Sequence, residues 1–137
     1  QMLDFLKKGG YIIANRYVTS NMAYQGAKFS DNKEKAKFLK WIYELEYKVH
    51  RLPKEDIVIY LNLPTAVSSQ LIIKRGKPKD IYEQDLNYLK KNELMYLELA
   101  NKYKHWAKID CLENGRLLSP TNIQQKIIKL LQTKGII

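Results

Sequence analysis

The sequence predicts an α/β fold built on parallel strands. Short β-branched runs alternate along the chain with longer segments that have helical periodicity, which is the order of elements expected for such a fold. The run 57–61 is nearly all apolar, as suits a parallel strand covered on both faces. With 137 residues, 45% of them hydrophobic and 28% charged, the chain has the size and composition of one soluble domain.

The first elements follow from glycine signals and β-branched residues. Residues 2–8 look like the end of a helix, for which Gly9 and Gly10 provide the stop signal. Tyr11 to Ala14 then predicts a strand. Polar residues begin where this strand ends.

The middle of the chain predicts a helix and then a strand. Asp31 is the expected N-cap of a helix over 32–50, with Glu34 at the capping-box position. The inward positions expected from periodicity are Phe38, Leu39, Ile42, Leu45 and Val49. Pro53 closes this region, and the apolar strand 57–61 follows.

The second half predicts two helices, a strand and a final helix. Pro64 opens a helix over 65–74, and a basic loop follows at 74–79. Asp80 and Glu83 flank the start of a long helix that ends near residue 103. Its expected inward positions are Tyr82, Leu86, Leu89, Leu94 and Leu97. A strand at 106–111 precedes a helix capped by Ser119 and Pro120, with inward positions Ile123, Ile127, Leu130 and Leu131.

Composition narrows the class of protein. The net charge of +10 comes largely from lysines scattered between apolar helix positions, without the basic and aromatic platform of a nucleic-acid binder. No apolar run reaches the ~20 residues of a membrane span. The single cysteine, Cys111, is expected to be a buried thiol in a reducing cytoplasm. One cysteine and two distant histidines form no metal pattern, so no metal ligands are expected.

The polar stretch 15–26 carries the strongest functional signal. Arg16 offers a fixed fork of donors suited to a phosphate. Asn21 and Gln25 each carry a donor and an acceptor, and four residues apart they share one helix face, where they can read the edge of a base. Because open α/β sheets bind ligands at the carboxyl ends of their strands, this stretch predicts a nucleotide site.

The same stretch resembles the Asp-Arg-Tyr-x-x-Ser-x-x-Ala-Tyr-Gln-Gly segment of thymidylate kinases, with Asn15 in place of the aspartate. The resemblance continues at 57–64, at 75–83 and at 106–110. It implies a P-loop NTPase-type three-layer α/β/α fold, of which this chain supplies the last three strands and their helices. Residues 1–137 are then a single partial domain with a lid at about 74–83.

The resemblance also implies the reaction and the site. Thymidylate kinases transfer a phosphoryl group from ATP to dTMP with Mg²⁺, giving dTDP for dTTP synthesis. Asn15, Arg16 and Arg75 are the implied catalytic residues, with Arg16 on the acceptor phosphate and Arg75 in the lid. The implied substrate contacts also include Ser20 near the phosphate and sugar, Asn21 and Gln25 at the thymine edge, Tyr24 beside the deoxyribose, and Tyr82 near the nucleoside. Ile81 replaces an arginine that many relatives have before this tyrosine.

The phosphate-binding loop Gly-x-x-x-x-Gly-Lys-Ser/Thr is absent, since none of the six glycines has another five residues on. In thymidylate kinases that loop lies near the amino terminus, so the amino-terminal third of the domain is expected to be missing. ATP and Mg²⁺ would be bound mainly by that segment, and the chain alone is expected not to turn over. The implied partners are dTMP and ATP, with a possible homodimer and neither nucleic acid nor membrane.

Two alternatives stay open. One is another P-loop nucleotide or deoxynucleoside kinase, which Asn21, Tyr24 and Gln25 argue against. The other is a non-catalytic nucleotide-binding descendant of the kinase, which Asn15, Ile81 and the absent loop favour.

Overall fold

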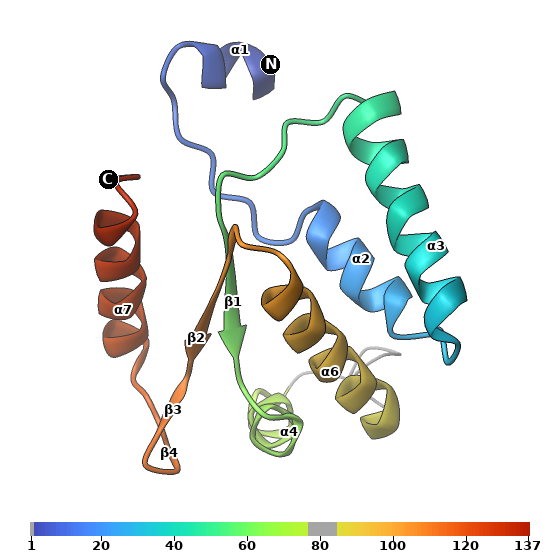
Figure 1. Cartoon of the computed structure of the whole chain (residues 1–137). Helices are drawn as coiled ribbons and strands as arrows, with labels where there is room; N and C mark the ends of the chain where they lie inside the picture. Colours follow the sequence, from blue (N-terminus) through green and yellow to red (C-terminus); the bar gives the residue numbers. More distant parts are fainter. Residues whose placement is uncertain (1, 77–84) are drawn as a thin grey trace. The chain divides into compact units, whose positions relative to one another are not determined.

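The computed structural model describes residues 2–76 and 85–137 (Figure 1). The chain divides into two compact units, Gln1–Asp56 and Ile57–Ile137, and each is described by itself. The expectation of one domain over 1–137 stays a prediction.

The first unit begins with helix α1, Met2–Lys7, as the sequence predicts. Gly9, just after this helix, has a φ of 79°, a conformation that glycine adopts without strain. The predicted strand at 11–14 is wrong, because these residues are irregular and Ile13 is 98% exposed. A strand persists only where its backbone groups pair with a neighbour, and within the described residues this segment has no partner strand.

Two helices make up most of the first unit, α2 over Val18–Gly26 and α3 over Asn32–Tyr43. They pack against each other, and Leu39 and Ile42 of α3 are buried as predicted. Between the helices, the rings of Phe29 and Phe38 stack with 5.1 Å between centroids. This aromatic pair secures the connection from one helix to the next.

The predicted cap of α3 is confirmed, since the Asp31 carboxylate accepts from the N–H groups of Lys33 and Glu34 at 2.8 and 2.9 Å. The helix continues as a π-helix, η1, over Glu44–Val49. Val49 is 69% exposed, so its predicted inward position is wrong. The i→i+5 bonding of a π-helix shifts the angular phase on which a 3.6-residue period relies.

The second unit contains a parallel pair of strands, β1 over Val58–Asn62 and β2 over Trp106–Asp110. Their register runs from Val58 opposite Trp106 to Asn62 opposite Asp110. This pair, with helices packed against it, confirms the predicted α/β class with a small parallel sheet. Two of the three predicted strands therefore form.

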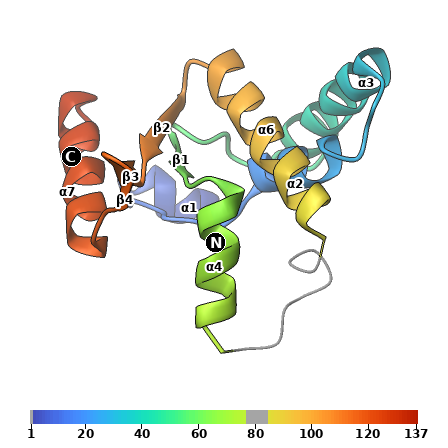
Figure 2. The same cartoon turned by 90° about the horizontal axis from the view of Figure 1, so that it is seen from below.

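Three helices accompany these strands: α4 over Thr65–Lys74, α6 over Leu86–Lys102 and α7 over Pro120–Thr133. Figures 1 and 2 show α7 beside β2 and α6 on the other side of the strand pair. Helices α4 and α6 are joined by Glu93, whose Oε2 accepts from the N–H and the hydroxyl of Thr65 at 2.9 and 2.6 Å. This carboxylate satisfies an N–H in the first turn of α4.

The inward face of α6 differs from the predicted one. Its buried residues are Asn92, Met95 and Leu99, whereas Leu86 and Leu94 are 55% and 56% exposed. The prediction is wrong for Leu86 and Leu94, whereas Leu89 and Leu97 are half-buried. It followed the leucines and could not anticipate that a buried asparagine belongs to the inward stripe. The predicted start of this helix, Asp80 to Glu83 with Tyr82, lies outside the described residues.

After β2 the chain forms a hairpin that the sequence reading missed, β3 over Leu112–Glu113 paired with β4 over Arg116–Leu117. Its turn residues, Asn114 and Gly115, have φ values of 50° and 73°. Cys111, just before the hairpin, is buried as predicted.

The cap of α7 is confirmed, since Ser119 Oγ accepts from the N–H of Asn122 at 3.2 Å. The predicted inward positions of this helix are only half-buried: Ile123, Ile127, Leu130 and Leu131. Within residues 2–76 and 85–137, no helix combines the length and the apolar character needed to cross a membrane.

Candidate nucleotide site

The polar stretch begins with a bend at Asn15 and Arg16, both exposed, directly before α2. Arg16 has a φ of 71°, which is in the left-handed region. Residues with a Cβ rarely adopt this conformation, and when they do, they concentrate at ligand-binding and catalytic sites. The strained residue is also the one that the sequence ranks first for phosphate binding.

The four predicted contacts on α2 share the face that is not fully buried. Ser20, Tyr24 and Gln25 are half-buried and Asn21 is exposed. The intervening residues Val18, Thr19, Met22, Ala23 and Gly26 are buried. The helix therefore brings the predicted base-reading pair, Asn21 and Gln25, together on one accessible side.

The bend and this helix face meet through a cation–π contact. Arg16 Cζ lies 4.3 Å from the centroid of the Tyr24 ring. A cation–π contact does not use up the N–H donors of a guanidinium, which can still form hydrogen bonds with an anion. Arg16 and the accessible face of α2 are thus adjacent in space as well as in sequence.

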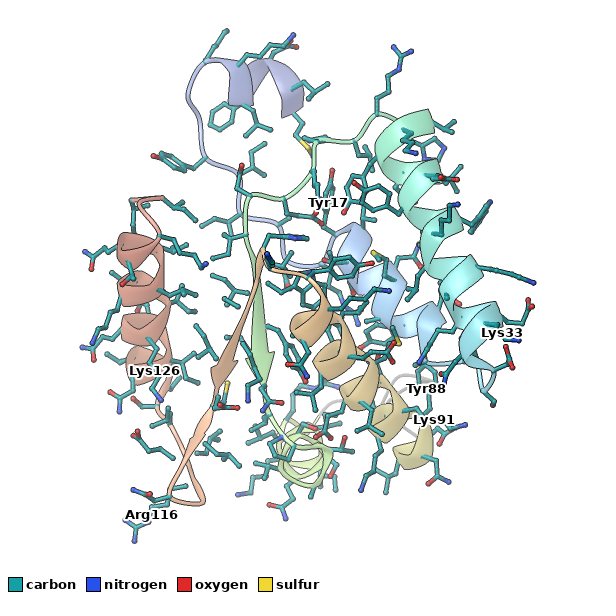
Figure 3. All side chains as sticks on the ribbon, in the orientation of Figure 1. Tyr17, Lys33, Tyr88, Lys91, Arg116 and Lys126 are labelled. Carbon is teal, nitrogen blue, oxygen red and sulfur yellow. The ribbon has the colours of Figure 1, made fainter. Side chains whose placement is uncertain are left out.

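Tyr17, the residue after Arg16, has a specific polar contact. It is the N-cap residue of α2, and its hydroxyl donates to the Pro53 carbonyl at 3.0 Å (Figure 3). Burial, with smaller contributions from Glu55 and Glu46, raises the pKa of Tyr17 above its usual value and keeps this hydroxyl protonated. A partner 36 residues away leaves no local signal in the sequence.

The segment that carries Pro53 is itself held at both sides. Leu52 N–H donates to the Glu46 carbonyl at 3.0 Å, and the Tyr47 hydroxyl donates to Glu55 Oε2 at 2.7 Å. Burial and this hydrogen bond raise the pKa of Tyr47 strongly. Pro53 therefore offers its carbonyl from a fixed position.

The remaining predicted site residues belong to the lid. Arg75 is exposed at the C-cap of α4, in the second unit. Tyr82 and Ile81 lie outside the described residues. The structure thus brings together Asn15, Arg16 and the four residues of α2 within the first unit.

A second polar group, missed by sequence reasoning, lies at the carboxyl ends of the parallel strands. Asn62 Nδ2 donates to Asp110 Oδ1 at 2.6 Å, and Lys108 Nζ lies 2.9 Å from the same oxygen. The hydrogen bonds from Asn62 and Lys108 hold the pKa of Asp110 below its usual value. The usable signal was that polar residues lie at the carboxyl ends of two predicted strands, with Asn62 just after 57–61 and Asp110 near the end of 106–111.

The second unit also has a groove, which is lined by none of the predicted site residues. A groove of about 350 Å³ lies between β2 and α7, where Lys126 and Lys129 border it. Lys126 Nζ also lies 3.9 Å from Glu113 Oε1. Within the described residues, no group of three or more His, Cys, Asp or Glu side chains could hold a metal ion.

Comparison with known proteins adds family information to this geometry. The sequence profile of the family described as thymidylate kinase matches residues 2–118. A thymidylate kinase of Buchnera aphidicola is 29% identical over 131 residues, which are 96% of this chain and 58% of that protein. One of Mycobacterium tuberculosis is 33% identical over 98 residues, covering 65% of this chain and 44% of the relative. A probable thymidylate kinase of Pyrococcus abyssi is 27% identical over 111 residues, covering 81% and 49%. The chain spans about half the length of these relatives.

Proposed function

Because the chain belongs to the thymidylate kinase family, we propose that it forms the dTMP side of an ATP:dTMP phosphotransferase. In the reaction, an oxygen of the dTMP phosphate bonds to the γ-phosphorus of ATP, the bond from that phosphorus to the β,γ-bridging oxygen breaks, and ADP leaves as dTDP forms. Such enzymes work chiefly by aligning phosphates and neutralising charge.

Arg16 binds the phosphate of dTMP in this proposal. Its in-plane donors form a fork for two phosphate oxygens while its face stays on the Tyr24 ring, with Cζ 4.3 Å from the centroid. Ser20 supports the phosphate and sugar. Asn15 contributes an amide, which hydrogen-bonds a phosphate or a metal-bound water but adds no negative charge and cannot act as a base.

The base and sugar are read from α2. Asn21 and Gln25 contact the edge of thymine, and Tyr24 lies beside the deoxyribose, where its ring disfavours a 2′-hydroxyl by crowding. The support is their common placement on the accessible side of this helix, next to Arg16.

The donor side involves Arg75 and Tyr82 of the lid, with ATP and Mg²⁺ as the remaining components. Arg75 brings a cation to the phosphates of ATP, and Tyr82 lies near the nucleoside. Mg²⁺ neutralises charge on the phosphates when bound.

The observation that carries the proposal is the left-handed Arg16 stacked on Tyr24, beside the face shared by Asn21 and Gln25. Its test is calorimetric titration of the complete gene product with dTMP, dUMP, GMP and CMP. We expect dTMP to bind, and binding of GMP or CMP without dTMP would contradict the proposal. Turnover with ATP and Mg²⁺ then separates an enzyme from a non-catalytic nucleotide-binding protein.

A matched pair of variants sharpens the assignment of the phosphate contact. Arg16→Ala is expected to weaken dTMP binding far more than binding of thymidine, which lacks the phosphate. Arg116→Ala removes an exposed arginine at the hairpin and serves as the control (Figure 3). Equal losses for dTMP and thymidine in Arg16→Ala would assign Arg16 a structural role instead.

Homodimerisation and a cytoplasmic location complete the proposal as predictions. The molar mass measured by light scattering checks the first, and fractionation of cells that produce the protein checks the second.

A further inference from the structure

Tyr17 lies between the strained residue Arg16 and a fixed carbonyl on another segment. Its backbone carbonyl accepts from the N–H groups of Ser20 and Asn21, at 3.0 and 3.4 Å, so the first turn of α2 holds its main chain. Its hydroxyl donates to the Pro53 carbonyl at 3.0 Å, so its side chain is held at the far end. Tyr17 is therefore fixed at two separate points.

A left-handed arginine needs such support. Its φ of 71° is disfavoured for a residue with a Cβ, and the bend would relax unless its neighbours hold it in place. A relaxed bend would swing the guanidinium away from the ring of Tyr24 and from the face of α2. The position of the cation thus depends on the residue that follows it.

We propose that Tyr17 is a positioning residue, which aims Arg16 at the acceptor phosphate through its hydrogen bond to the Pro53 carbonyl. The inference rests on the proposed function, in which Arg16 binds that phosphate. Tyr17 itself touches no substrate. Its hydrogen bond to Pro53 ties the bend at Arg16 to residues 51–56 and limits how far the bend can move.

Tyr47 and Glu55 contribute to this positioning because their hydrogen bond helps to hold the segment that carries Pro53. The Tyr47 hydroxyl donates to Glu55 Oε2 at 2.7 Å, and Leu52 N–H donates to the Glu46 carbonyl. These bonds flank Pro53 in sequence and fix its carbonyl from both sides. Loosening either bond also loosens the anchor of Tyr17.

The test compares dTMP with thymidine on the complete gene product carrying Tyr17→Phe, using calorimetry. The affinity for dTMP depends on the position of Arg16, whereas the affinity for thymidine depends on the proposed base-contacting face of α2. Loss of one ordinary hydrogen bond predicts an approximately fivefold loss of dTMP affinity, with thymidine affinity unchanged. A residue that only supported the fold would weaken both ligands together.

Tyr43→Phe is the matched control. It removes the same hydroxyl from a neighbouring tyrosine, whose ring packs on Tyr47 with 4.9 Å between centroids. This variant is expected to keep the ratio of dTMP to thymidine affinity at the parent value. Tyr47→Phe removes the hydroxyl that binds Glu55 and leaves the Tyr17 hydroxyl in place. It is expected to lower that ratio by a smaller factor.

Each outcome bears on the inference. An unchanged affinity ratio in Tyr17→Phe, or equal losses for both ligands, overturns it while the proposed function stands. A parent protein that binds neither ligand overturns the proposed function and the inference with it. If Tyr17→Phe does not fold, Tyr47→Phe decides: a lowered ratio supports the positioning role, and an unchanged one overturns it.

Discussion

Arg16 lies with its guanidinium over the ring of Tyr24, in the second turn of the helix that follows it, and 4.3 Å separates Cζ from the ring centroid. The contact places a cation beside the face of α2 before any ligand arrives. Because the side chain is already ordered, less rotamer freedom is lost when a phosphate binds. The bend and the helix therefore act as one preorganised unit.

This stack predicts different effects for two substitutions of Tyr24. Tyr24→Phe keeps an aromatic face under Arg16, so the stack persists. Tyr24→Leu removes it and loses an interaction of about 0.5–1 kcal/mol, typical of an exposed cation–π contact, which is roughly a twofold to fivefold loss of dTMP affinity. Calorimetric titration of both variants with dTMP checks this, and equal affinities for the two would contradict it.

The second prediction concerns the core of the second unit. Leu99 is 0% exposed, and Leu94 on the same helix is 56% exposed. Leu99→Ala leaves a buried cavity and is expected to lower the free energy of unfolding by about 2–5 kcal/mol. Leu94→Ala, the same chemical change on the outer face, is expected to stay within about 0.5 kcal/mol. Urea unfolding of both variants measures the difference, and equal losses would mean that the inward stripe of α6 is misassigned.

The same helix illustrates what sequence patterns could and could not predict. Caps were predictable, because Asp31 and Ser119 act on backbone N–H groups two or three residues away. The inward stripe of α6 was not, because Asn92 is polar and tertiary packing decides which side is buried. Helix caps can be predicted because the interacting residues are close in sequence, whereas burial of a polar residue depends on distant parts of the chain.

One predicted strand did not form and one hairpin was not predicted, for opposite reasons. Tyr11 to Ala14 has the composition of a strand, but pairing requires a second strand that composition does not reveal. The hairpin after β2 was overlooked although Asn114-Gly115 is the favoured dipeptide of a two-residue turn with positive φ. The shared accessible side of Asn21 and Gln25 was predictable because it follows from helical spacing. The Tyr17–Pro53 bond, which spans 36 residues, was not.

The third prediction is a loss of stability at alkaline pH. Burial first, and then the carboxylate of Glu93, raises the pKa of Tyr60 to about 12, from a model-peptide value of 10.0. Below pH 10 both the folded and the unfolded states hold this proton, so its contribution to stability is fully present. Between pH 10 and 12 the unfolded state releases the proton and the folded state keeps it, so the free energy of unfolding falls.

Tyr60→Phe removes this titration. Its free energy of unfolding is expected to fall less steeply than that of the parent between pH 10 and 12, although it starts lower because the hydrogen bond to Asn62 is lost. Tyr11→Phe, at a position that is 70% exposed, is the control and should parallel the parent. Urea unfolding at several pH values measures the slopes, and parallel curves for the parent and Tyr60→Phe would rule out the assignment.

The fourth prediction concerns the pair at the carboxyl ends of the strands. The Asn62 amide is the first cause of the low pKa of Asp110, and the Lys108 ammonium is the second. Removing the amide with Asn62→Ala is expected to raise the Asp110 pKa toward its usual value. A carboxyl group with a depressed pKa stabilises the folded state at pH values above its unfolded pKa, and this contribution is lost as the pH falls through its folded pKa. The free energy of unfolding of Asn62→Ala is therefore expected to fall less at acid pH than that of the parent.

Asn62→Asp is the sharper variant, because it places a second carboxylate at the 2.6 Å contact in place of the donor. Like charges at that distance disfavour ionisation, so the pair should titrate above the Asp110 value of the parent. Asn101→Ala, at an exposed position of α6, leaves the pair untouched and is the control. Carboxyl chemical shifts followed by NMR against pH report these values. An unchanged Asp110 pKa in Asn62→Ala would show that Lys108 alone sets it, and that the amide contributes only to the pairing of β1 with β2.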